Sequence, residues 1–139
     1  MEGMTFRSEI EALQPDALIG FFEGWPDPPS PETHLEILRN SWAVELACEQ
    51  ATGQVVGFVN AISDGFYSAY IPLLEVLPSY RGRGIGQALV RRLLDRCASF
   101  YMVDVCCDED VAPFYARFGM IPVRGMCARS FDYQSGVAG

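Results

Sequence analysis

Apolar side chains recur with a helical period in several parts of the chain. Residues 84–99 place apolar side chains at positions 85, 88, 89, 93 and 94 and charged ones on the other face, which predicts an amphipathic helix. Ser30 followed by Pro31 is typical of a helix start, since serine caps the first turn and proline fits its first position. The predicted helices cover residues 17–25, 30–40, 84–99 and 111–118.

Strand-like runs rich in apolar residues fill most of the remaining chain. Four prolines between residues 26 and 31 exclude a helix or a strand there, and turn signals at Gly53 and Gly65 separate neighbouring runs. The predicted strands are residues 5–10, 42–49, 54–63, 66–77 and 100–107, the last of them buried, with one or two closing strands in residues 121–131. This order of helices and strands predicts an α/β or α+β fold with a mixed sheet.

Length and composition narrow the class of protein. A chain of 139 residues, half of them apolar and 20% charged, fits one globular domain over residues 1–139. No apolar run approaches the roughly 20 residues of a membrane helix. The first residues lack the basic and apolar regions of a signal peptide. Five cysteines and one histidine lack metal-ligand spacing. We therefore expect a cytoplasmic protein with reduced thiols, no metal and no membrane partner.

Charge is unevenly distributed along the chain, which has a net charge of −8 and no lysine. Residues 1–80 carry two arginines against twelve acidic residues, whereas residues 81–139 carry eight against six. An acidic chain repels phosphate backbones, so nucleic acid is not an expected partner. Five arginines within residues 81–96 nevertheless indicate a local site for a small phosphorylated ligand. Of these, we interpret Arg91, Arg92 and Arg96 as solvating the outer face of their helix.

The most informative segment is VLPSYRGRGIGQALV, residues 76–90, in which a strand ends, a tight turn follows and a helix begins. Glycines at positions 82, 84 and 86 let the backbone approach a ligand without a clash from a Cβ atom. Backbone N–H groups at such a turn, together with the helix dipole, are suited to bind a diphosphate. The spacing matches neither a dinucleotide-binding loop nor a Walker A loop.

The run RGRGIG, residues 81–86, resembles the R/Q-x-x-G-x-G/A motif of the GNAT superfamily of acetyl-CoA-dependent N-acetyltransferases. The resemblance implies a mixed, mostly antiparallel central sheet that is flanked by helices and splays in the middle to hold acetyl-CoA. It also implies that the loop binds the diphosphate and that the preceding strand offers backbone groups to the pantetheine arm and the thioester. The implied acetyl-CoA-binding residues here are Val76, Leu77, Arg81, Gly82, Arg83, Gly84, Ile85 and Gly86.

A second segment, DEDVAPFYARFG at residues 108–119, resembles the N-x-x-A-x-x-x-Y-x-x-x-G-F stretch of the same superfamily. The resemblance places Tyr115 at the tyrosine that protonates the departing CoA thiolate. A phenol has an ordinary pKa near 10, so it is protonated at neutral pH and can donate in this way. Asp108 stands where an asparagine is common, and its position implies a contact to acetyl-CoA or to the acceptor.

The group that removes a proton from the acceptor amine is harder to identify. Glu75 is the first candidate, because burial of a lone carboxylate would raise its pKa toward the useful range. Asp104 and Asp108 are alternatives, as is proton loss through ordered water. His34 is predicted to be solvated on a surface helix, and Trp25 is interpreted as part of a lid beside the proline-rich loop.

The sequence thus predicts an enzyme, an acyltransferase that moves acetyl from acetyl-CoA directly to a primary amine in a ternary complex. The acidic N-terminal half favours a cationic small molecule such as a polyamine or an amino sugar. A peptide amine is also open as the acceptor. The alternative is a non-catalytic module that binds acyl-CoA as a sensor. A homodimer is left open.

Overall fold

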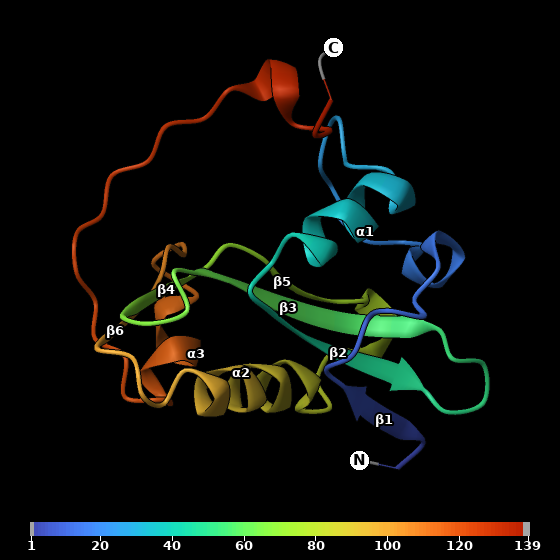
Figure 1. The fold of residues 1–139 in the computed structure, drawn as a ribbon, viewed down its shortest axis with the longest axis horizontal. Coiled ribbons are helices and arrows are strands. Elements are labelled where there is room, and N and C mark those ends of the chain that lie inside the picture. Colours follow the sequence, from blue (N-terminus) through green and yellow to red (C-terminus); the bar gives the residue numbers. More distant parts are fainter. Residues whose placement is uncertain (1, 138–139) are drawn as a thin grey trace.

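Residues 2–137, the part of the chain that the structure describes, form a six-stranded sheet flanked by helices in the computed structural model (Figure 1). The strands are β1 (Met4–Arg7), β2 (Ala43–Glu49), β3 (Val55–Ser63), β4 (Ser68–Ile71), β5 (Leu74–Val76) and β6 (Met102–Val105). Their order is β1-β2-β3-β4-β6, with β5 also paired to β3. Every described pair is antiparallel except β4 with β6, which confirms the mixed, mostly antiparallel sheet.

The helices lie on both faces of this sheet, with α1 on one side and α2 on the other (Figure 1). They are η1 (Pro15–Leu18), α1 (Pro31–Arg39), η2 (Pro78–Tyr80), α2 (Ile85–Arg96), α3 (Ala112–Ala116) and η3 (Phe131–Tyr133), where η denotes a 3-10 helix. The start of α1 is as predicted, because the Ser30 side chain accepts the N–H of Thr33 at 3.1 Å and Pro31 opens the first turn.

The central strands β2 and β3 are buried on both faces, which explains their nearly continuous apolar sequence. Leu46 and Phe58 point to the side of α1, where they join one hydrophobic cluster. Ala47 and Val59 point to the side of α2 and join the other. Alternation of side chains along a strand sends sequence neighbours to opposite clusters.

His34 is buried rather than solvated, so the prediction for this residue was wrong. It lies on the inner side of α1, and its ring centroid is 4.4 Å from that of Phe58 and 4.8 Å from that of Phe22. Neither ring nitrogen has a hydrogen-bond partner among the described residues. Burial lowers the pKa of His34 to about 4. At neutral pH the imidazole is therefore an uncharged aromatic core residue.

The predicted helix over residues 17–25 is also wrong, because only the short η1 forms in this region. Gly20, Phe22 and Gly24 adopt φ angles of 97°, 63° and 81°, in the left-handed region that a right-handed helix does not contain. Phe22 is the one non-glycine residue among residues 2–137 with a positive φ. The chain from 20 to 25, called the 20–25 loop below, is thus held in an unusual conformation.

The long strand predicted at residues 66–77 is divided in two at Pro72, which has no N–H to donate to a ladder. β4 pairs with both β3 and β6, whereas β5 pairs with β3 alone. The sheet therefore opens between β5 and the residues that follow β6.

The closing strands predicted in residues 121–131 do not form among the described residues. Residues 120–130, called the strap below, run as an extended segment past the end of β6, where a Cβ atom on Gly125 would lie 3.7 Å from the Cys106 sulfur, and η3 returns the chain to α1 (Figure 1). There the Gln134 side-chain oxygen accepts the N–H of Asp27 at 2.9 Å. Since the strap does not cover β6, this strand lies at the sheet edge and is half-exposed rather than buried as predicted.

Candidate functional site

The glycine loop, residues 81–86, connects η2 to α2. Gly82 and Gly84 have φ angles of 78° and 82°, and Gly84 is the N-cap of α2. A Cβ atom on Gly82 would meet nothing within 4 Å, so the loop surface is open. The first N–H groups of a helix have no partner within it, and the positive end of the dipole lies there. The loop therefore offers backbone donors and room to an anion, and it fits the diphosphate of acetyl-CoA.

The two loop arginines are held differently. Arg81 donates from Nε to the Val76 carbonyl at 2.9 Å, and its Nη2 lies 2.9 Å from a carboxylate oxygen of Glu23. Arg83 donates to the Ser79 carbonyl at 3.4 Å and forms no ion pair with a described residue. Arg83 is thus the freer cation, while Arg81 connects the loop to the end of β5.

The end of β5 exposes one set of backbone groups toward the opening of the sheet. The Leu77 N–H donates to Val56 at 2.8 Å, and the Leu73 carbonyl accepts from Asn60 at 3.3 Å. Hydrogen-bonded residues alternate along an antiparallel pair, so Leu73, Glu75 and Leu77 bond to β3. The backbone of Val76 therefore faces away from β3, where its carbonyl accepts from Arg81. Both backbone groups of Leu77 are already used, the N–H by Val56 and the carbonyl by Tyr80.

Glu75 holds the 20–25 loop through both oxygens of its carboxylate. One oxygen accepts the N–H of Phe22 at 2.7 Å, and the other accepts the N–H of Glu23 at 3.2 Å. These two bonds fix the backbone next to the left-handed Phe22. A carboxylate has about four acceptor positions, so Glu75 retains capacity for a further partner.

A cavity of about 220 Å³ lies at this junction. Its lining residues are Phe22, Glu23, Trp25, Phe58, Leu73, Leu74, Glu75 and Arg81. Carboxylates and aromatic rings thus share one small space with the side chain of a loop arginine. A larger cavity of about 650 Å³ lies on another side of the loop, and it includes Ser79, Tyr80 and Arg83.

Tyr115 lies on the short helix α3 and is buried, with 7% of its surface exposed. Burial, with a smaller contribution from the nearby Cys107, raises the pKa of Tyr115 to about 12. The hydroxyl is thus protonated at neutral pH. The neighbouring Phe114 ring brings α3 to the glycine loop, because a Cβ atom on Gly86 would lie 3.8 Å from that ring and 3.7 Å from Val76.

The two other acidic candidates lie apart from Glu75. Asp108 follows β6, is exposed, and accepts the N–H of Val111 with its backbone carbonyl at 2.9 Å. Asp104 is exposed on β6 and pairs in register with Tyr70. Within residues 2–137 neither side chain forms an ion pair.

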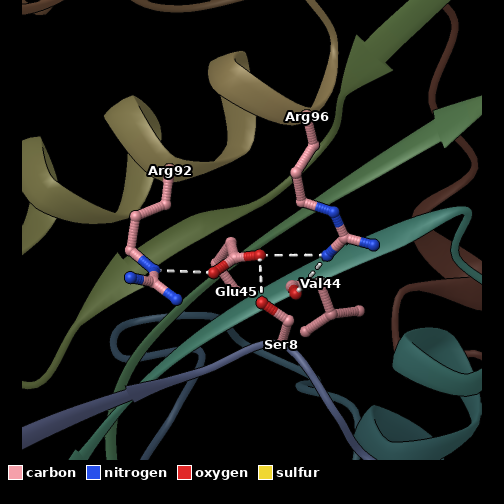
Figure 2. Close-up of polar contacts among 5 residues, drawn as sticks. All are labelled: Ser8, Val44, Glu45, Arg92 and Arg96. Atoms are coloured by element: carbon pink, nitrogen blue, oxygen red, sulfur yellow. Dashed lines mark hydrogen bonds and ion pairs between the residues drawn. The ribbon is translucent and has the colours of Figure 1, made fainter.

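The arginines of α2 do more than solvate a helix face, which corrects the prediction for Arg92 and Arg96. Figure 2 shows the Glu45 carboxylate between them. Arg92 Nε lies 2.8 Å from one carboxylate oxygen, and Arg96 Nη1 lies 2.9 Å from the other, which also accepts from Ser8 at 2.7 Å. Glu45 is only 1% exposed, so this buried charge depends on its partners. The cluster attaches α2 to β2.

Two residues of this region were missed in the sequence, Glu23 and Phe114. Glu23 is one of many acidic residues in the first half of the chain, and only the fold brings it to Arg81. Phe114 directly precedes Tyr115, and only its aromatic side chain could have indicated that it packs beside the glycine loop. Residues 2–137 contain no cluster of three or more metal-ligating side chains, and no helix among them is long and apolar enough to cross a bilayer.

Comparison with known proteins gives consistent results. A profile of the acetyltransferase (GNAT) family matches residues 10–120. A crystal structure of a protein described as an acetyltransferase from Deinococcus radiodurans R1 is 46% identical, with a TM-score of 0.94 over 99% of this chain and 96% of that one.

Two curated relatives are similar over part of their length. The uncharacterized N-acetyltransferase ycf52 of Pyropia yezoensis is 27% identical over 110 residues, which are 74% of this chain and 63% of that protein. The glucosamine 6-phosphate N-acetyltransferase of Trypanosoma brucei brucei is 32% identical over 89 residues, 58% of this chain and 60% of that protein. The chain thus spans less than two thirds of either relative.

Proposed function

The chain belongs to the acetyltransferase (GNAT) family, and from this premise we propose that it transfers acetyl from acetyl-CoA directly to a primary amine in a ternary complex. The observation that carries the proposal is the glycine loop, where two left-handed glycines open the start of α2 beside the backbone of Val76. We assign the diphosphate to the backbone of residues 82–86, with charge from Arg81 and Arg83. The N–H of Val76 would bind the pantetheine arm, since the carbonyl of Val76 already accepts from Arg81. Leu77 would contribute only its side chain, because its N–H and its carbonyl are bonded to Val56 and Tyr80. Asp108 is the remaining assigned contact.

Acetyl-CoA supplies an acetyl group as a thioester when it is bound. Tyr115 acts as the general acid, because its hydroxyl stays protonated when the pKa is raised to about 12. It gives its proton to the sulfur as the carbon–sulfur bond breaks, and the amine nitrogen forms the new bond to the acetyl carbon. The phenol is then restored by a proton that the acceptor has lost.

Glu75 is our candidate for the group that takes a proton from the acceptor amine. Its carboxylate lines the small cavity and keeps free acceptor positions beside its bonds to Phe22 and Glu23. Ordered water remains the alternative route for this proton, with Asp104 and Asp108 less favoured because they lie apart from the cavity.

The acceptor is proposed to be a cationic small molecule. Glu23, Glu75 and the ring of Trp25 line one cavity, and carboxylates with an aromatic face attract an ammonium group. Polyamines and amino sugars satisfy this chemistry. A phosphorylated amino sugar belongs in the same test because one relative is named for glucosamine 6-phosphate.

The test is thiol release from acetyl-CoA, followed with a thiol-reactive dye in the presence of polyamines, amino sugars, glucosamine 6-phosphate and a peptide amine. We expect steady release with one amine class and formation of the acetylated amine by mass spectrometry. A protein that binds acetyl-CoA but releases no thiol with any amine would instead support the non-catalytic sensor.

A further inference from the structure

Two exposed free cysteines lie in the region where the strap passes the end of β6 (Figure 1). Cys106 directly follows β6, and Cys127 belongs to the strap. A Cβ atom on Gly125 would lie 3.7 Å from the Cys106 sulfur, which is van der Waals contact. Side chains two residues apart in an extended chain point to the same side. The side chain of Cys127 therefore lies on the side of the strap that faces Cys106.

The surroundings of Tyr70 place both cysteines in the same neighbourhood. Tyr70 pairs in register with Asp104 across β4 and β6, so its side chain lies on the face of the sheet that Asp104 and Cys106 share. The pKa of Tyr70 is raised, chiefly by hydrogen bonding with the Cys106 thiol, and the charges of Arg129 and Cys127 act on it as well. Residues from two strands and from the strap thus gather around one hydroxyl group.

The strap is free to bring the two sulfurs into contact. A disulfide requires Cβ atoms about 3.5–4.5 Å apart, and Cys127 lies about 7 Å along the strap from Gly125. The backbone groups of residues 120–129 make no backbone–backbone hydrogen bond within the described part of the chain. The attachments of the strap at Gly119 and Gln134 lie outside this stretch. A small shift of the strap therefore breaks no strand pairing.

The other three cysteines are less well placed to react with Cys127. Cys48 and Cys97 are buried. Cys107 is exposed, but it directly follows Cys106 and so points to the other face of the sheet, where it contributes to the raised pKa of Tyr115. Oxidants reach exposed thiols more readily than buried ones.

We propose that Cys106 and Cys127 form a site of oxidation by peroxide, at which an intramolecular disulfide joins the end of β6 to the strap. The thiolate of one cysteine attacks a peroxide oxygen, the O–O bond breaks, and a sulfenic acid and one molecule of water form. The sulfur of the other cysteine then attacks the sulfenic sulfur, the S–S bond forms, and a second water leaves. Two electrons pass from the thiols to the peroxide, and the thiol protons leave in the two waters.

The disulfide would close a ring over residues 106–127, which contains α3 and most of the strap. A segment that no strand pairing holds would then be attached covalently to the sheet. The reaction needs only the two thiols and peroxide, so it does not depend on acetyl transfer.

The test is treatment of the reduced protein with a small excess of hydrogen peroxide, followed by blocking of the remaining thiols and digestion of the denatured chain with trypsin. Trypsin cleaves after arginine, so residues 125–129 form a peptide with Cys127 as its single cysteine, and residues 97–117 form another. Mass spectrometry should find these two peptides joined in the wild type and in Cys107→Ser, but not in Cys106→Ser. Cys107→Ser is the matched control, because it removes the neighbouring exposed thiol.

Limited digestion of the folded protein gives a second measurement that needs no variant. Cleavage after Arg124, which lies exposed in the strap, should divide the reduced chain into two fragments in denaturing electrophoresis. The same fragments of the oxidised chain should stay joined until a reductant is added.

Three results would overturn the proposal. The first is a link from Cys127 to Cys107 that persists in Cys106→Ser. The second is a disulfide that joins two copies of the chain rather than two parts of one. The third is oxidation of Cys106 and Cys127 to sulfenic or sulfinic acids with no disulfide between them.

Discussion

Arg81 of the glycine loop forms an ion pair with Glu23 of the 20–25 loop, with Nη2 2.9 Å from Oε2. The same guanidinium bonds the carbonyl of Val76 at the open edge of β5. One side chain therefore connects the loop proposed to bind the diphosphate with the cavity proposed to bind the amine. An anion at the loop competes with Glu23 for Arg81, so the two parts of the site are electrostatically coupled.

Glu23→Gln should strengthen acetyl-CoA binding, because Arg81 is then released to the diphosphate. Both side chains of this pair are 52% exposed, so the gain is small, up to about fivefold for a pair of about 1 kcal/mol. Calorimetric titration with acetyl-CoA measures it. Glu36→Gln is the control, since it removes an exposed pair with Arg39 on α1.

Arg81→Ala should weaken the binding of acetyl-CoA but not the binding of acetyl-pantetheine, which lacks the diphosphate. Equal losses for both ligands would contradict the assignment of Arg81.

Gly84→Val should abolish acetyl-CoA binding. A branched side chain in the left-handed region is strained, and its Cβ atom occupies the space where backbone meets phosphate. Gly53→Val is the matched control, because Gly53 has a φ of 75° in the turn between β2 and β3. Both variants should lose stability in thermal denaturation, but only the first should lose affinity. Wild-type affinity in folded Gly84→Val would refute the diphosphate site.

Tyr115→Phe should lower kcat by roughly 10²–10⁴-fold, because it removes the proton donor and keeps the buried ring. Acetyl-CoA affinity should change little, since the glycine loop is untouched. A general acid must be protonated to act. Because the pKa of Tyr115 is raised to about 12, the rate should not fall at moderately alkaline pH through loss of its proton. The dependence of kcat on pH and the affinity for acetyl-CoA, measured on one folded preparation, test this prediction. An unchanged kcat with an active acceptor would show that Tyr115 is only a core residue.

The stability of the fold should fall in mildly acidic solution because of His34. Its pKa falls from 6.5 to about 4 on folding, so the unfolded chain binds the proton more tightly. The free energy of unfolding is therefore unaffected by His34 protonation above pH 6.5. It decreases as the pH falls toward 4, by about 3 kcal/mol in total. Urea denaturation of wild type and His34→Leu at several pH values measures it. Parallel curves for the two proteins would mean that His34 does not cause the loss.

The sequence correctly predicted those segments whose structure depends on residues close to them in the chain. The Ser30 cap, the apolar period of α2 and the glycines at 82 and 84 act within one or two turns, and each element forms where it was expected. The pattern of apolar residues alone left the fold open between the α/β and α+β classes. The resemblance to a family then predicted the arrangement of the sheet.

The errors come from contacts between residues far apart in the chain. Arg92 lies on the polar face of its helix, and nothing near it in sequence indicates Glu45, 47 residues earlier. His34 is polar by type, yet the fold surrounds it with aromatic rings. The strap has the composition of a strand, but a strand needs a partner, and the described chain places none beside it.

α2 is attached to the sheet by ion pairs near its C-terminal end and by buried apolar side chains, Ile85 and Leu89, toward its N-terminal end. Arg92 and Arg96 fix it near its C-terminal end, while the proposed diphosphate site is at Gly84, about 18 Å away along twelve residues. A tilt of about 5° around that pivot would displace the N-terminus by roughly 1.5 Å, enough to break a hydrogen bond to phosphate. Glu45 on β2, which is not part of the proposed site, thus contributes to the orientation of the helix that begins at the proposed diphosphate site.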